Sequence, residues 1–281
     1  SKDALIQQVI APSAGTNVTS NLANLGSVKN AGLEGLVTAQ IINYSTIGWD
    51  LTVSASRNSN KLVKLGTGIP PIIGTNTRQI PGYPLNGYWR QTFTYNDANN
   101  DGIIVPSEEQ VSDSASFLGY SQPRDEIGFN TGVELFNRRL RLATSVDYKG
   151  GNTLDNREQE SLCQQTISCP GTSSHDATLF QQARTIASRY TPVTTTAGFF
   201  ENDQYWKIRE VSATLTLPDN IAQRYLRSRA ANISLAARNV ATFTKFTGID
   251  PEANFSLANL QDNLLTQGPP TYYTVRLNLS F

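Results

Sequence analysis

The chain ends on the stretch TYYTVRLNLSF, residues 271–281, in which apolar and polar side chains alternate. A period of two places Tyr273, Val275, Leu277, Leu279 and Phe281 on one face and Thr274, Arg276, Asn278 and Ser280 on the other. Such a strand fits the edge of a soluble sheet, but it also has the roughly 9–11 residues of a tilted membrane strand. The rest of the chain has to decide between these two interpretations.

Composition narrows the class of protein. The 281 residues include 23 Lys and Arg against 23 Asp and Glu, so no net charge favours a nucleic acid partner. Mean hydropathy is -0.33, and no apolar run approaches about 18 residues, which excludes a transmembrane helix but leaves a barrel open. Because the chain has no Met and no signal sequence at Ser1, we expect its N-terminus to be a cut within a longer protein.

Alternating segments dominate the chain, and eight of them are predicted to be strands. They cover approximately Ala4 to Ala11, Gly32 to Asn43, Trp49 to Arg57, Glu126 to Phe136, Arg139 to Lys149, Tyr205 to Leu217, Ala231 to Ala241, and Tyr272 to Phe281. In the second segment, Leu33, Val37, Ala39 and Ile41 are expected to share a face. In the fifth, Arg139, Arg141, Ser145, Asp147 and Lys149 form a polar face that needs water. We therefore predict an all-β protein built from antiparallel strands.

The connections between these segments alternate between short and long. Ser45 to Gly48 and Asn137-Arg138 are tight turns, whereas residues 58–125, 150–204 and 242–271 are long polar stretches. Connections of that length are unusual in a compact soluble domain. Short periplasmic turns that alternate with long extracellular loops are typical of outer-membrane barrels, so the pattern favours a transmembrane β-barrel.

Aromatic residues gather near the ends of the predicted strands. They are Tyr44, Trp49, Tyr148, Tyr205, Trp206, Tyr272, Tyr273 and Phe281. Ordinary core filling is one explanation. A barrel offers another, because Tyr and Trp form girdles at both membrane interfaces.

One loop matches a calcium-binding motif. Asp97, Asn99, Asp101, Gly102 and Glu108 occupy the positions of D-x-[DN]-x-[DN]-G-x₅-E, and Ile103 stands where a backbone carbonyl would bind the ion. The usual flanking helices are missing, since Pro106 falls where the second helix would begin. We predict a structural Ca²⁺ site, with an acidic turn that holds no ion as the alternative.

Other reactive residues give little sign of catalysis. His175 is the only histidine and lies in a polar loop, and no pair of carboxylates stands in a recognisable catalytic frame, so we expect no enzyme activity. Cys163 and Cys169 are the only cysteines, in the loop sequence CQQTISC. Two cysteines this close can pair in an oxidising compartment, which predicts a disulfide, with free thiols as the alternative.

Several stretches together resemble the C-terminal part of SusC/RagA-type TonB-dependent outer-membrane transporters. Asn24, Gly26, Asn30, Gly32 and Glu34 match a strand-entry pattern of that family. LGYSQPRDEIGFNTGVELF (residues 118–136) and YWKIREVSATLTLP (residues 205–218) follow in the family's order. ARNVATFTKFTGIDPEANF (residues 237–255) is the strongest match, and the amphipathic strand ending in Phe281 completes the series.

The resemblance implies that residues 1–281 are the C-terminal part of a barrel of roughly 22 strands, without its plug, TonB box and N-terminal strands. Such a protein imports nutrients, here an oligosaccharide or a peptide, across the outer membrane of a Gram-negative, Bacteroidetes-like cell, where it would be a multi-pass protein in contact with lipid. A SusD-like surface lipoprotein and the TonB complex are the implied partners, and Arg139, Arg141, Arg238 and Arg276 would face the plug. The competing interpretation is a secreted, calcium-stabilised β-sandwich that serves as a binding or adhesion module.

Overall fold

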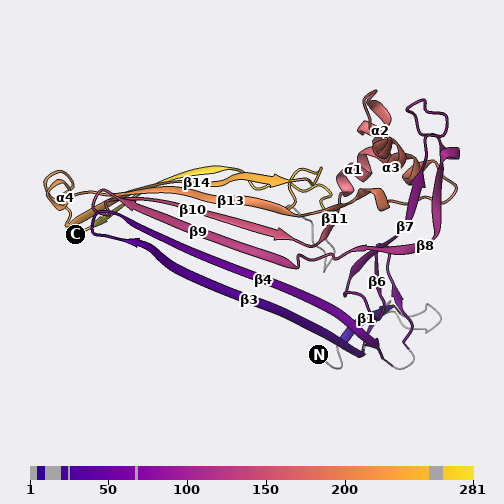
Figure 1. Ribbon diagram of the computed structural model, residues 1–281, viewed down its shortest axis with the longest axis horizontal. Coiled ribbons are helices and arrows are strands. Elements are labelled where there is room, and N and C mark those ends of the chain that lie inside the picture. The colour runs from indigo at the N-terminus through magenta and orange to yellow at the C-terminus, as the bar shows by residue number, and fades with distance from the viewer. Residues whose placement is uncertain (1–4, 10–19, 25, 67–68, 253–261) are drawn as a thin grey trace.

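Seven long antiparallel strands form one open sheet, and Figure 1 shows these strands running across the view. The computed structural model describes residues 5–9, 20–24, 26–66, 69–252 and 262–281. The order across the sheet is β15-β14-β13-β10-β9-β4-β3. Their bounds are β3 (Gly26–Asn43), β4 (Gly48–Leu65), β9 (Asp125–Leu135), β10 (Leu140–Gly150), β13 (Tyr205–Thr216), β14 (Ala230–Thr244) and β15 (Tyr272–Ser280). Strands adjacent in this order pair antiparallel, and β3 and β15 at the two edges do not pair with each other within the described residues.

Seven of the eight predicted strands belong to this sheet, whereas the first does not. β1 (Leu5–Val9) pairs instead with β2 (Ser20–Asn24) in a separate two-stranded sheet. The ends of that predicted segment, Ala4 and residues 10–11, lie outside the described residues. Alternation identified a strand here but carries no information about which neighbour the strand pairs with.

The register separates the side chains into an apolar outer face and a polar inner face. Val275 stands opposite Leu235 and Leu277 opposite Ile233, while Arg276 stands opposite Ser234 on the other side of the sheet. The outer face is open: Tyr273 is 80% and Val275 75% exposed. Within the described residues no second sheet covers it, so the β-sandwich interpretation is not supported.

Bulges shift the faces of two strands, and one of them corrects a predicted face. The pairing of β3 with β4 shifts between Gln40 and Ile42, so Ile42, and not Ile41, stands opposite Trp49 on the outer face. In the pairing of β13 with β10, the partners of Ser145 and Val146 are Glu210 and Ile208, which leaves Arg209 as an extra residue on β13. In the pairing with β14 the extra residue lies on β14, where Asn239 and Val240 stand between the partners of Glu210 and Ile208. A bulge reverses the alternation beyond it, and a strict period of two cannot anticipate this.

One end of the sheet carries short connections. The β9–β10 turn contains Phe136, Asn137 and Arg138 in the left-handed conformation (φ 54°, 57° and 61°), and Arg139 lies in this turn, just before β10 begins. An unpredicted helix, α4 (Asp219–Leu226), joins β13 to β14 at the same end, beside the C-terminus (Figure 1).

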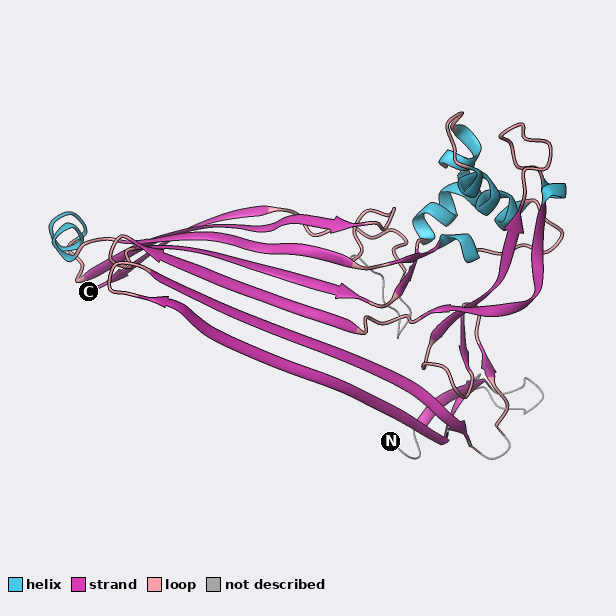
Figure 2. Ribbon diagram, viewed as in Figure 1, coloured by secondary structure: helices cyan, strands magenta, loops and turns pink. Residues whose placement is uncertain are grey.

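The opposite end carries a thick layer of ordered structure, where the sequence predicted only long polar loops (Figure 2). A four-stranded sheet is formed by β5 (Ile72–Ile73), β6 (Thr77–Gln79), β7 (Gly87–Tyr95) and β8 (Glu109–Gly119), with η2 (Pro106–Glu108) before β8. The next connection holds β11 (Thr153–Asp155), α1 (Arg157–Ser161), η3 (Leu162–Thr166), α2 (Pro170–Ser173), α3 (Leu179–Arg189), η4 (Ala197–Phe199) and β12 (Phe200–Asn202). None of the described helices is both long and apolar enough to cross a membrane.

The predicted aromatic girdle is partly wrong. Trp49, Tyr148, Trp206 and Tyr273 lie in register with outer-face residues, and Tyr148 packs on Trp206 with ring centroids 4.9 Å apart. Tyr205, however, is buried, and it and Tyr272 belong to the inner face. Phe243, opposite Trp206, is an outer-face aromatic that the prediction missed. The position of an aromatic near a strand end does not reveal its face once the strand contains a bulge.

Candidate functional surface

The inner face carries charged side chains that are paired with one another. Arg141 on β10 places Nη1 2.7 Å from Asp50 Oδ1 on β4 and 3.2 Å from Glu134 Oε1 on β9. To reach β4 the guanidinium must cross β9, and it does so over Gly132, which stands opposite both Asp50 and Ala143. A Cβ on Gly132 would overlap the guanidinium. The absence of a side chain there is therefore what allows the ion pair to bridge three strands.

A second charged cluster lies where β13 meets the layer of short strands and helices at that end of the sheet, which we call the loop layer. Lys207, only 2% exposed, places Nζ 3.0 Å from Asp250 Oδ2 and 2.9 Å from Glu252 Oε2. Arg209, the bulge residue, binds both oxygens of Glu252 and holds Asp147 Oδ2 of β10 at 2.7 Å. Burial alone would raise the pKa of the Glu252 carboxyl, but hydrogen bonds from Arg209 and Lys207 lower it to about 2.

We call residues 246–252, FTGIDPE, the anchor segment. This cluster holds them to the seven-stranded sheet, which we call the wall, and further contacts hold them to the loop layer. The backbone N–H of Thr247 donates to Glu201 Oε2 at 2.8 Å, and the Thr247 hydroxyl donates to Oε1 at 2.7 Å. Gly248 lies so close to the Phe246 ring and the Asn263 amide that a Cβ would clash with both. The motif that carried the family resemblance is therefore a connector between wall and loops.

Glu201 of β12 also joins the anchor segment to the helices of the loop layer. Arg184 of α3, which is buried, places Nη1 3.2 Å from Glu201 Oε1, and its guanidinium lies 5.1 Å from the centre of the Phe199 ring. Asn156, which caps α1, donates to Glu201 and to Thr247 Oγ1. Buried charges and amides are costly unless partnered, so these contacts hold the layer in one arrangement.

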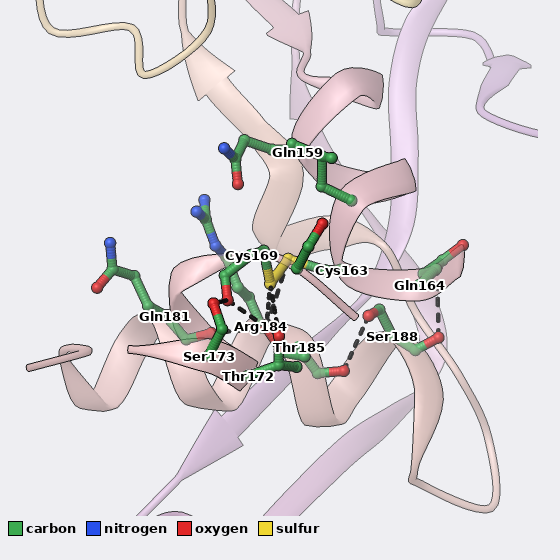
Figure 3. Close-up of a disulfide and its surroundings, with 12 residues drawn as sticks. Gln159, Cys163, Gln164, Cys169, Thr172, Ser173, Gln181, Arg184, Thr185 and Ser188 are labelled. Atoms are coloured by element: carbon green, nitrogen blue, oxygen red, sulfur yellow. Dashed lines mark hydrogen bonds between the residues drawn. A yellow bond between two sulfur atoms is a disulfide. The ribbon is translucent and has the colours of Figure 1, made fainter. Parts of the chain in front are cut away.

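The predicted cysteine pair lies at the centre of the helices, as Figure 3 shows. Cys163 of η3 and Cys169, just before α2, form a disulfide with their Cα atoms 4.9 Å apart. Both cysteines are buried and pack against Phe199, and the Thr185 hydroxyl of α3 lies against both sulfurs. The disulfide thus joins η3 and α2 to the same core that holds Arg184.

The predicted calcium loop, between β7 and η2, is folded on its own backbone. Asp97 Oδ2 accepts from the Gly102 N–H at 3.0 Å, and Asp101 Oδ1 accepts from the Ile103 N–H at 2.8 Å. The Glu108 carboxylate accepts from the N–H groups of Ala98 and Val105. In the described part of the chain, no three His, Cys, Asp or Glu side chains gather closely enough to hold a metal ion. Calcium binding through Asp97, Asn99, Asp101, Ile103 and Glu108 stays a prediction.

Sequence reasoning missed Lys207, Arg209 and Glu201. A signal was present in YWKIRE, where Lys207 and Arg209 interrupt a strand of large apolar residues. Lys207 lies 43 residues before Asp250 and 45 before Glu252, and Arg209 lies 43 residues before Glu252. No local pattern identifies such pairs.

An open antiparallel sheet with an apolar outside, a charged inside, short connections at one end and a folded layer at the other is the architecture of an outer-membrane barrel wall. The comparisons agree. The chain is 22% identical over 278 positions to the "TonB-dependent receptor P3" of Formosa agariphila, covering 88% of this chain and 27% of that protein. No family model matches the chain.

Solved structures show the same fold. A structure of the RagAB peptide transporter superposes on 100% of this chain with a TM-score of 0.72 at 20% identity. The RagAB peptide importer in its closed-closed state superposes on 98% with a TM-score of 0.73 at 18% identity. The chain spans 32% of the length of each. The resemblance to SusC/RagA-type TonB-dependent transporters is thus confirmed at the level of fold, and these relatives are a receptor and importers, not enzymes.

We predict that Lys207→Met releases the anchor segment from the wall. Removing the ammonium leaves Asp250 and Glu252 without one of their cations, and breaking a buried pair in this way costs about 3–5 kcal/mol. Hydrogen exchange of the amides of residues 246–252 in the full-length protein measures the effect. Lys245→Met, which removes a neighbouring exposed lysine, is the matched control. Unchanged exchange in Lys207→Met would show that the cluster does not hold the segment.

We predict that Gly132→Val destabilises the protein through Arg141. The added side chain displaces the guanidinium, and overpacking of this kind costs about 1–3 kcal/mol. In an Arg141→Ser background the same substitution should be tolerated, which gives a coupling energy of about 0.5–3 kcal/mol in a double-mutant cycle by denaturant unfolding. Gly35→Val, at a strand glycine with open space around its Cβ position, is the control. Additive effects of the two changes would contradict this role for Gly132.

If the acidic loop binds calcium, titration calorimetry of the chelator-treated full-length protein should give a Kd of about 10⁻³ M or tighter. Glu108→Gln should abolish the binding because it removes the carboxylate that closes the shell. Asp113→Asn, at an exposed acid outside the motif, should leave it unchanged. The absence of any binding heat in the wild-type protein would make the loop a plain acidic turn.

Proposed function

We propose that the chain forms the C-terminal part of the barrel of a TonB-dependent importer in the outer membrane of a Gram-negative, Bacteroidetes-like cell. The observation that carries the proposal is the single-layer sheet, because its apolar face is open while the charges of the other face are paired. A bilayer supplies the hydrocarbon that the outer face lacks, and a lumen supplies a polar setting for the inner face. The fold shared with the RagAB structures supports the same conclusion.

In this proposal the inner face contacts a plug supplied by an upstream part of the protein, through which the TonB complex acts. Arg141 and Arg238 are already paired, with Asp50 and with Glu210 at 2.6 Å. They would shape the lumen wall and not bind plug carboxylates. Arg276 forms no salt bridge within the described residues and has its charge available for the plug.

The loop layer is the part of the chain that would meet a SusD-like surface lipoprotein. This layer exposes apolar side chains, among them Ile103, Phe180, Tyr190 and Val193. Exposed apolar groups on a rigid, disulfide-linked layer fit a protein partner. The substrate would be an oligosaccharide or a peptide. The shared fold with RagAB, which is a peptide importer, favours a peptide.

The proposal predicts an asymmetry between neighbouring residues of β15. Leu277→Arg puts a charge on the outer face and should cost about 2–4 kcal/mol if that face lies in hydrocarbon, whereas Asn278→Arg on the inner face should cost far less. Folding of the full-length protein into lipid vesicles, followed by denaturant titration, measures both. Equal effects, or a folded monodisperse protein without detergent, would overturn the membrane placement.

Import itself is tested in cells that carry the full-length protein. Uptake of labelled peptides and of labelled oligosaccharides should depend on the protein and should stop when the proton-motive force is collapsed. Whichever substrate class shows this dependence is the class imported. Uptake of neither class, with the barrel correctly assembled, would contradict the proposed function while leaving the fold intact.

A further inference from the structure

The helix α4 interrupts the end of the sheet that otherwise has short connections. Its sequence, DNIAQRYL, begins at Asp219, whose negative charge suits the positive end of a helix. Arg227 ends the helix in the left-handed conformation (φ 51°), and the Ser228 N–H closes it by donating to the Ala222 carbonyl at 3.2 Å. A plain turn would suffice to join β13 to β14, so the helix needs a separate explanation.

The helix is in contact with β14, the strand that follows it. Ala231 stands opposite Leu279, which puts it on the outer face, yet Ala231 is only 2% exposed while Leu279 is 38% exposed. Ala230, on the inner face beside it, is exposed. The covering therefore comes from the outer side, and α4 is the element in contact with this end of β14. Its own buried residue is Ala222.

The remainder of α4 and the residues after it expose a basic and aromatic surface. Tyr225 is 70% exposed, and the Arg224 guanidinium lies 5.6 Å from the centre of its ring. Arg227 and Arg229 are also exposed. Within the described residues none of these three arginines forms a salt bridge, whereas Arg141, Arg209 and Arg238 on the inner face all do. Three exposed arginines without a salt bridge among the described residues therefore lie together at the α4 end of the sheet.

We propose that α4 and the arginines that follow it bind the anionic phospholipid headgroups at the periplasmic surface of the outer membrane. The inference rests on the proposed function, which places the outer face in a bilayer. An aromatic ring and arginines at the boundary of an apolar surface match the chemistry of a membrane interface, where the ring lies at headgroup depth and the guanidinium groups bind phosphate. The helix would fix the depth of the barrel at the end where the chain finishes.

The experiment places a nitroxide spin label at Gln223, an exposed position of α4, in the full-length protein from which other free thiols have been removed. The protein is inserted into phosphatidylcholine nanodiscs with and without phosphatidylglycerol. We expect the label to be less accessible to a water-soluble nickel reagent when phosphatidylglycerol is present. The nickel accessibility gives the ratio of membrane-bound to free α4. Each Arg→Gln change at 224, 227 and 229 should lower this ratio roughly fivefold. Lys29→Gln, Lys61→Gln and Lys64→Gln, at the other end of the sheet, should have no effect.

A second label at Leu277 distinguishes failure of the proposed lipid contact of α4 from failure of the proposed function. If the Leu277 label is accessible to oxygen and the Gln223 label is fully accessible to nickel in both lipids, the barrel wall stands and the lipid contact of α4 is overturned. The same holds if the three Arg→Gln changes alter nothing. If the Leu277 label is itself in water, the proposed function fails as well.

Discussion

Successive side chains of a β-strand point to opposite faces, and nearly every feature of this chain depends on that geometry. In β13, β14 and β15 it places leucine, valine and alanine outside and arginine, serine and asparagine inside, without any second layer of structure. In water an open apolar face of this kind is unfavourable. In a bilayer the same face is the favourable arrangement, because all backbone groups of the sheet interior are already hydrogen-bonded to neighbouring strands.

The inner face shows how charge is accommodated in such a wall. Arg141, Arg209 and Arg238 each contact at least one carboxylate on a neighbouring strand or on the anchor segment. Pairing across strands neutralises the wall locally and also ties strands together through their side chains. Gly132 leaves room for the Arg141 guanidinium because it has no side chain. A glycine within a strand also weakens that strand, because it has no side chain to pack against its neighbours. Arg141, Arg209 and Arg238 are thus neutralised by carboxylates, whereas Arg276 on the same face forms no salt bridge within the described residues.

The loop layer is joined to the wall through the anchor segment. Lys207 and Arg209 hold it from the sheet, and Glu201 with Asn156 holds it from the loops. Beyond these, the disulfide and Arg184 bring α3 and η3 into the same unit. A layer built in this way can present a fixed surface to a partner, since its position relative to the barrel is set by buried charged contacts and not by a flexible connection.

The sequence by itself determined the strands, their two faces and the alternation of short and long connections, because hydrophobic periodicity is a local property. Each of the seven predicted segments between Gly32 and Phe281 has at least one end within a few residues of the corresponding strand end. β3 and β4 extend well beyond the predicted segments at their other ends. The pairing of Cys163 with Cys169 was also predicted, from their proximity in the sequence and the assumption of an oxidising compartment. Only the tertiary structure decided the rest. Bulges at Gln40–Ile42 and at Arg209 move side chains between faces, and Lys207 meets Glu252 only after the chain has returned through β14. The contact between α4 and β14, in which Ala231 of the outer face is buried, is likewise a feature of the tertiary structure and not of the helix sequence. Contacts of this kind depend on distance in space, which no pattern along the chain encodes.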